Sequence, residues 1–202
     1  MWSIHNRLDI IAKYEVLERV GFNAYSDVYR ARRLSDNLVV ALNEVHDYQS
    51  AFCKIEDLEI LQNSLNVVIL HEYLWWEDGN KDVVLVLEYL RIDLARVVRE
   101  AKRDDCGIGI GDLKRWMVQI LYGVDACHKN GIVFRDLKPD NLLVSNDGVL
   151  KIACSNCSSG LAWSSHEAEF LETKYVIIVS AFLLRFIFFK WLTWHTNCTP
   201  SI

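Results

Sequence analysis

Five polar residues crowd into seven positions of the chain, within the stretch GIVFRDLKPDN at residues 131–141. They are Arg135, Asp136, Lys138, Asp140 and Asn141, and the apolar residues LLV follow at once. A carboxylate such as Asp136 can take a proton from an attacking hydroxyl group, and a lysine can neutralise negative charge on a group in transfer. An amide oxygen such as that of Asn141 can hold a metal ion. These residue types suit catalysis, although a polar turn that joins a helix to a strand would have the same composition.

The elements on either side of this stretch are predicted by the spacing of apolar residues. Before it, apolar residues at helical spacing predict a helix over 112–130, with Asp112 as its N-cap and Gly131 as the stop after its C-terminus. After it, the apolar runs LLV and VLKIA flank the turn NDG, which predicts a hairpin of two short strands. The polar stretch therefore lies between an amphipathic helix and a hairpin.

The first ninety residues are rich in short, β-branched and partly alternating segments. Five of them predict strands: 14–20, 27–33, 39–45, 66–76 and 82–90. Between the third and the fourth, Phe52, Ile55 and Leu58 approximate helical spacing and predict a helix over 48–63. The expected fold class is therefore α+β, with a small, mostly β lobe followed by a helical lobe that begins near Asp93.

Composition and charge bound the class of protein. The 202 residues are 51% hydrophobic and 24% charged, which is a globular balance, and the net charge of −5 gives no basic footprint for nucleic acid. Six cysteines without framework spacing predict a reducing compartment, the nucleus or the cytoplasm. The opening MWSIHNRLDI lacks a basic region followed by an apolar core, so we expect no signal peptide.

RDLKPDN matches the catalytic-loop pattern of protein kinases, in which an asparagine follows the aspartate five residues later. Residues 14–153 resemble a eukaryotic protein kinase of the cyclin-dependent class. NAYSDVYRARRLSDNLVVAL and DYQSAF are similar in particular to the plant F-type kinases, which activate other cyclin-dependent kinases. The resemblance implies an ATP-dependent protein serine/threonine kinase, with ATP and Mg²⁺ as cofactors and cyclin-dependent kinases or a cyclin as partners.

The resemblance also divides the chain and assigns roles to residues. It implies a kinase-like N-terminal lobe over 1–92, a partial C-terminal lobe over 93–153 and a divergent apolar tail over 154–202. Four apolar residues would enclose adenine: Val20, Val28, Ala41 and Leu143. Three residues would contact adenine through the backbone or approach the ribose: Glu88, Leu90 and Asp93. The implied catalytic set is Asp136, Lys138 and Asn141, with Asn141 also a metal ligand. Without the resemblance, the apolar members are ordinary core positions.

The positions that should contact phosphate depart from the family pattern. The glycine-rich loop reads GFNAYS, so only Gly21 of its glycines remains. VALNEV places Asn43 where the family has the lysine that pairs with the nucleotide phosphates, and an amide supplies no positive charge. The helix glutamate position holds Lys54. A solvated side chain is favoured for Lys54 over one that reaches inward to replace the missing charge.

Later positions depart as well. Cys154 stands at the metal-binding aspartate position, and a thiol is a poor ligand for Mg²⁺. Phe134 replaces the histidine before Arg135, and the resemblance is expected to stop near residue 153. The apolar segment 176–194 has about the length of a membrane span, but Arg185 and Lys190 within it disfavour insertion. An amphipathic or buried helix and a non-native tail of a misread gene are the alternatives, and the last is favoured.

Three functions remain open at this point. The first is an active kinase, which the changes at Asn43 and Cys154 disfavour. The second is a pseudokinase that binds a kinase or cyclin partner through its small lobe and the helix over 48–63. The third is a decayed, truncated copy of a kinase gene, which the sequence favours because catalytic positions and the downstream lobe are missing together.

Overall fold

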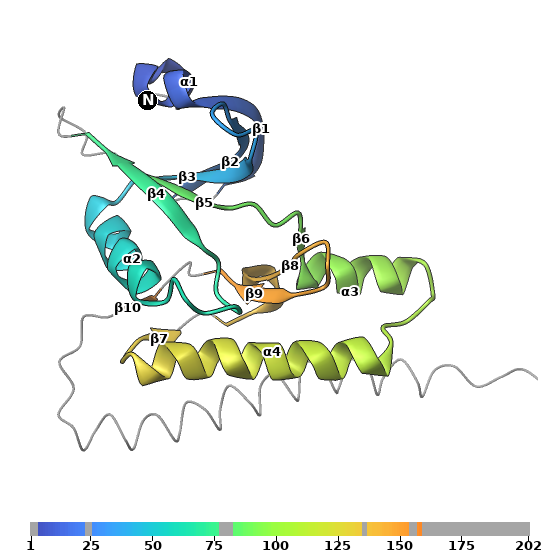
Figure 1. Ribbon diagram of the computed structural model, residues 1–202. Coiled ribbons are helices and arrows are strands. Elements are labelled where there is room, and N and C mark those ends of the chain that lie inside the picture. The colour runs from blue at the N-terminus through green and yellow to red at the C-terminus, as the bar shows by residue number, and fades with distance from the viewer. Residues whose placement is uncertain (1–3, 23–25, 77–82, 135–136, 154–156, 159–202) are drawn as a thin grey trace, which may run out of the picture. The chain divides into compact units, whose positions relative to one another are not determined.

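The computed structural model describes residues 4–22, 26–76, 83–134, 137–153 and 157–158 (Figure 1). All of them belong to one of the two units of the chain, residues 1–160. An antiparallel sheet occupies the first half of this unit, and two long helices with a short hairpin follow. The predicted α+β class is therefore confirmed. The apolar segment 176–194 lies outside the described residues, and no helix within them is both long and apolar enough to span a membrane.

All five predicted strands form, and they pair into one sheet. Their bounds are β1 Tyr14–Phe22, β2 Ser26–Arg33, β3 Val39–Val45, β4 Leu70–Trp75 and β5 Val83–Glu88. The order across the sheet is β1-β2-β3-β5-β4, and each neighbouring pair is antiparallel. This order places β3 and β5 in the middle of the sheet, where both faces of a strand are covered by other elements.

Alternation along β3 and β5 separates two packed faces of the sheet. On one face, Val40, Leu42, Val84 and Val86 form a core cluster with Ile4 and Ile10. Ile4 belongs to the short helix η1 (Ile4–Asn6) and Ile10 to α1 (Leu8–Lys13), two elements that the sequence did not predict. On the other face, Val45, Val83 and Leu85 pack with Ala51 and Ile55 of α2 (Tyr48–Ile60).

Helix α2 confirms the helix predicted over 48–63, although it ends at Ile60. Asp47 is its N-cap, because a carboxylate oxygen accepts a hydrogen bond from the backbone N–H of Gln49 at 3.2 Å. The helix lies between the sheet and the later elements of the chain (Figure 1). Some residues on its buried face pack against the sheet, and others lie beneath the sheet.

The remaining described elements follow the sheet along the chain. They are β6 Ile92–Asp93, α3 Leu94–Arg103, α4 Ile110–Lys129, β7 Val133–Phe134, η2 Pro139–Asn141, β8 Leu142–Val144, β9 Leu150–Ile152 and β10 Cys157–Ser158. Strands β6, β8 and β9 make one small sheet, and β10 pairs with β7. The predicted hairpin is confirmed: Gly148 takes a φ of +79° in its turn, and the Ser145 N–H donates to the Val149 carbonyl at 2.9 Å.

The long helix α4 corrects one prediction and confirms another. Asp112 is not its N-cap, because the Leu113 N–H already donates to the Gly109 carbonyl at 3.1 Å and the helix begins at Ile110. Asp112 lies in the first turn instead, where it accepts a hydrogen bond from Arg115 at 2.8 Å. The predicted stop is confirmed, since Gly131 follows the C-cap Asn130 with a φ of +71°, a conformation that favours glycine.

The segment between α2 and β4 is joined to strand β9 through hydrogen bonds, one of them buried. The Asn66 side-chain amide donates to the Leu150 carbonyl at 2.8 Å, and the Ile152 N–H donates to the Asn66 carbonyl at 2.9 Å. Val68 donates its N–H to the Ile152 carbonyl at 3.1 Å, so the backbone pairs on both sides of Val67. Strand β9 is thereby held against the small lobe.

Candidate functional site

A cavity of about 560 Å³ lies beneath the sheet, within the size range of small-molecule sites. Eleven of the site residues named from the sequence line it: Val20, Gly21, Val28, Ala41, Asn43, Glu88, Leu90, Asp93, Lys138, Asn141 and Leu143. Asp136 and Cys154 lie outside the described residues. The structure thus brings together every predicted site residue that it describes.

The register of the sheet explains why the upper wall of the cavity forms. Gly21 pairs with Val28, Val28 pairs with Asn43, and Asn43 pairs with Leu85, so one row of residues crosses four strands. All four members of this row line the cavity. Ala41 lies two residues before Asn43 on β3, and therefore on the same face of the sheet. Among the described residues, a Cβ atom on Gly21 would meet only Val28, at 3.8 Å, which is an ordinary contact, so their packing does not demand glycine there.

An ion pair fixes the edge of the cavity where the sheet leads into the helical lobe. The Lys151 ammonium lies 2.7 Å from a carboxylate oxygen of Glu88, and these side chains are only 11% and 25% exposed. The Glu88 backbone N–H donates to the Ile69 carbonyl at 2.9 Å. Since β9 carries Lys151 and β5 ends at Glu88, this pair ties the hairpin of the second lobe to the sheet of the first.

Asp93 has a structural task that the sequence analysis missed. Its carboxylate accepts a hydrogen bond from the Arg96 backbone N–H at 2.6 Å and caps the N-terminus of α3. The same residue pairs with Leu143 across β6 and β8, which brings both residues to the cavity wall. The sequence signal was available, because an aspartate directly before the helical segment LARVVREAKR is a typical N-cap.

The lower wall carries oxygen donors and a lysine. Lys138, Asp140 and Asn141 come from η2 and the residue before it, and all three line the cavity. The Ala153 N–H donates to the Asn141 carbonyl at 2.9 Å, which fixes this short helix against the end of β9. Asp140 was noticed in the sequence without a role.

Carboxylate and amide oxygens, such as those of Asp140 and Asn141, are the ligand type that Mg²⁺ prefers. The described residues hold no group of three or more histidine, cysteine, aspartate or glutamate side chains placed to bind a metal.

Lys54 is where the structure overturns an expectation about the site. Its side chain is not solvated: the residue is 7% exposed and lines the cavity. Burial lowers the pKa of its ammonium group, and the negative charge of Asp47 opposes that shift. The physical reason is its place on α2, because Lys54 follows Ala51 by three residues and precedes Leu58 by four, on the buried face of the helix.

Asn43 faces the same cavity from β3. Its Oδ1 atom is buried and accepts no hydrogen bond from any residue that the structure describes. Buried side-chain oxygens normally have a partner. The inner end of the cavity therefore combines a buried cation on α2 with an unsatisfied amide on β3, beside the apolar side chains of Leu58, Val68 and Leu85.

Comparisons with known proteins match most of the chain. The family model described as the protein kinase domain matches residues 14–175, which extends beyond residue 153, where the resemblance was expected to stop. The chain is 62% identical to cyclin-dependent kinase F-1 of Arabidopsis thaliana over 157 residues, and 51% identical to cyclin-dependent kinase F-1 of Oryza sativa over 153. Each match covers 75% of this chain and 32% of the relative. Cyclin-dependent kinase 20 of Danio rerio is 34% identical over 148 residues, which cover 70% of this chain and 41% of the relative.

Proposed function

Because the chain belongs to the protein kinase domain family, we propose that its cavity binds a purine nucleotide, with ATP as the natural candidate, and that it transfers phosphate poorly or not at all. One observation carries the binding half of this proposal. The row Gly21, Val28, Asn43 and Leu85 crosses four strands and lines a cavity of about 560 Å³. Apolar side chains on two walls of such a cavity would hold a flat, apolar ring.

The backbone between β5 and β6 would orient the purine. Glu88, Leu90 and Arg91 line the cavity there, and the ion pair from Lys151 holds Glu88 in place. Backbone N–H and C=O groups at this edge would bond to the ring, with Asp93 near the ribose. Leu143 on β8 and Val28 on β2 would enclose the ring from opposite walls, and both line the cavity.

Weak phosphate transfer follows from the groups that face the phosphates. ATP supplies the phosphoryl group that a kinase moves, and catalysis of that transfer depends on positioning and on charge neutralisation. Asn43 contributes no positive charge, and Cys154 offers a thiol where the family pattern has a carboxylate. Asp136 and Lys138 of the catalytic stretch remain. We therefore expect the chain to bind nucleotide more effectively than it transfers phosphate from it.

A second function, recruitment of a partner, is favoured by the outer side of α2 and β4. Phe52 of α2 and Trp75 of β4 meet edge to face with ring centroids 5.3 Å apart. Trp75 is 43% exposed, and Ile60 at the end of α2 is 52% exposed. We propose a cyclin-dependent kinase or a cyclin in the nucleus or cytoplasm as the partner of this face. Retention of neither on the immobilised chain would contradict this second function.

Thermal melting with ligands tests the binding proposal. A ligand that binds only the folded state raises its stability by about 2.7 kcal/mol at a hundredfold excess over Kd. We expect adenosine and ATP, each with and without Mg²⁺, to raise the melting temperature of the 202-residue chain, while a generic protein substrate gains no phosphate. A cooperative melt that no nucleotide shifts would reject the nucleotide function. A chain with no cooperative transition would support the alternative of a decayed fragment.

A further inference from the structure

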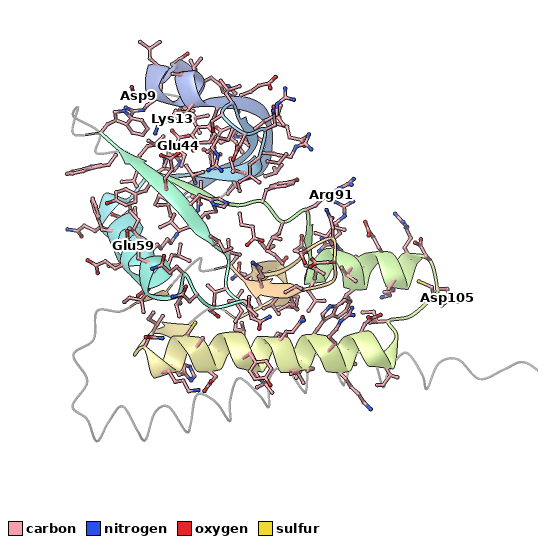
Figure 2. All side chains as sticks on the ribbon, viewed as in Figure 1. Asp9, Lys13, Glu44, Glu59, Arg91 and Asp105 are labelled. Carbon is pink, nitrogen blue, oxygen red and sulfur yellow. The ribbon has the colours of Figure 1, made fainter. Side chains whose placement is uncertain are left out.

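Lys54 is the most deeply buried positive charge among the described residues that line the cavity. Two other cations line it, Arg91 and Lys138, and both are exposed. Arg91 lies on the segment between β5 and β6, as Figure 2 shows, and Lys138 precedes η2. Lys54 instead projects from the buried face of α2 and is 7% exposed. Glu59, labelled further along α2 in Figure 2, is exposed on the other side of the helix.

No ion pair or hydrogen bond in the described part of the chain offsets the burial of Lys54. An ammonium group removed from water without a partner is strongly unfavourable. Within the described part of the chain, Lys54 forms no ion pair and donates no hydrogen bond. Among the described residues, the negative charge of Asp47 favours the ionised form of Lys54, but burial outweighs it and lowers the pKa. Lys54 therefore lines the cavity as a largely buried cation that no described residue contacts in an ion pair or a hydrogen bond.

The facing strand lacks a positive charge at the corresponding position. Asn43 on β3 occupies the position at which a kinase places its phosphate-binding lysine. Its Oδ1 atom is buried and has no hydrogen-bond donor among the described residues. Lys54 and Asn43 line one cavity from α2 and β3. The positive charge is therefore absent from the strand and present on the facing helix.

We propose that Lys54 is the residue that binds the phosphate groups of the nucleotide, with its ammonium group replacing from α2 the charge that β3 lacks. This inference rests on the proposed nucleotide function and deepens it, since it assigns an anionic phosphate chain to the inner end of the cavity. The phosphates would give Lys54 the counter-charge that the protein alone does not provide. The Asn43 amide would donate to the same phosphate chain through its Nδ2 atom.

Calorimetric titration with adenosine, ADP and ATP tests this assignment. We expect Lys54→Met to weaken ATP binding about tenfold or more and to leave adenosine binding within about twofold of the unmodified chain. Lys54→Arg should retain most of the ATP affinity. Adding Asn43→Lys to Lys54→Met should recover it, because the charge then returns to the strand. The matched control is Lys129→Met, which removes a lysine that is 71% exposed and lies far along α4.

Stability provides a second readout that a purely structural lysine would move in the opposite direction. Without nucleotide, we expect Lys54→Met to melt at a higher temperature than the unmodified chain, because a thioether of similar length replaces a buried, unpaired charge. If Lys54 served the fold, the same substitution would lower the melting temperature. A lower melting temperature with unchanged ATP affinity would therefore overturn the inference.

Lysine acylation followed by peptide mass spectrometry keeps the test valid even if the variants do not fold. In the unmodified chain we expect ATP, but not adenosine, to slow the acylation of Lys54, with Lys129 unaffected by either. Acylation of Lys54 at the same rate with and without ATP would overturn the inference. If adenosine binds while ATP gains nothing over it, Lys54 is not a phosphate ligand and the nucleotide function still stands. If neither binds, both proposals fail together.

Discussion

The two ends of the cavity differ in how far they follow the protein kinase pattern. At the end that we assign to adenine, Val28, Ala41 and Leu143 are the apolar residues that the resemblance implied. At the end that we assign to phosphate, Asn43 and Lys54 depart from the pattern on both facing elements. Leu85, which also lines the cavity, belongs to the core cluster that packs α2 on the sheet. Leu85 thus serves packing as well as the cavity, whereas the Asn43 Oδ1 atom and the Lys54 ammonium have no hydrogen-bond partner among the described residues.

Blocking the adenine end should have the largest effect on this comparison. Ala41 is 9% exposed on β3 and faces the cavity, so Ala41→Trp would place an indole in the space proposed for the purine. We expect adenosine and ATP to lose affinity equally, by at least about tenfold. Ala95→Trp on α3, outside the cavity, is the control and should bind both normally. Unchanged adenosine affinity in Ala41→Trp would show that the purine binds elsewhere.

Removing the ion pair at the edge of the adenine end should cost less. Lys151→Met leaves the partly buried Glu88 carboxylate without its partner at 2.7 Å, so we expect unfolding in urea to become easier by about 2 kcal/mol. Lys129→Met is the matched control, because the Lys129–Asp125 pair is exposed and such pairs contribute little to stability. Equal losses in the two variants would mean that burial of the Glu88 pair is unimportant.

Two glycines of α4 test how tightly this helix packs against β9 and the segment before β4. A Cβ on Gly123 would lie 2.7 Å from Ile152 Cδ1 and 2.8 Å from the Asn66 carbonyl oxygen, so Gly123→Ala should destabilise the chain by about 1–3 kcal/mol. At Gly111 no atom of the described residues outside the helix's own backbone lies within 4 Å of the same position, and Gly111→Ala should stabilise by up to about 1 kcal/mol. Chemical denaturation of both variants gives the comparison. If both substitutions changed stability alike, helix propensity alone would explain them.

The smallest expected effect concerns a buried thiol on the same helix. Burial and the negative charge of Asp57 raise the pKa of Cys127 to about 12. At pH 8 we therefore expect iodoacetamide to modify the exposed Cys106 well before Cys127, as read by peptide mass spectrometry. In the unfolded chain the thiol has a pKa of about 8.5, so it loses its proton at a lower pH than in the folded chain. The free energy of unfolding therefore falls as the pH rises from about 8.5 towards 12. Equal modification of the two thiols at pH 8 would contradict the burial of Cys127.

Local pattern was enough to predict much of the fold. The five strands, the helices α2 and α4, the stop at Gly131 and the hairpin around Gly148 all follow from apolar period and turn chemistry. Ile4 and Ile10 were missed because their helices, η1 and α1, are too short to show a period, although both residues are fully buried. The N-cap of α4 was misplaced because the apolar repeat begins at Leu113, after the backbone has already turned helical.

The part of the site that depends on strand register could be predicted from the sequence. The part that depends on contacts between residues far apart in the sequence could not. The row from Gly21 to Leu85 follows from antiparallel pairing of strands that the sequence located correctly. The Glu88–Lys151 pair joins residues 63 positions apart, which no local pattern reveals. Lys54 could have been placed correctly, since its spacing from Ala51 and Leu58 put it on the apolar face. The usual preference of lysine for water outweighed that signal in the prediction.

The hydrogen bonds on both sides of Val67 determine how the cavity can open. Ile152 donates to Asn66, and Val68 donates to Ile152, so a backbone bridge links the sheet-bearing lobe to β9. Pulling the lobes straight apart would break both bonds and the buried bond from Asn66 to Leu150, at about 1 kcal/mol or more each. The Glu88–Lys151 ion pair links the same parts of the chain at a second place, at the edge of the cavity beside Arg91. The walls of the cavity are therefore restrained at two separate points, and separating them would break contacts at both.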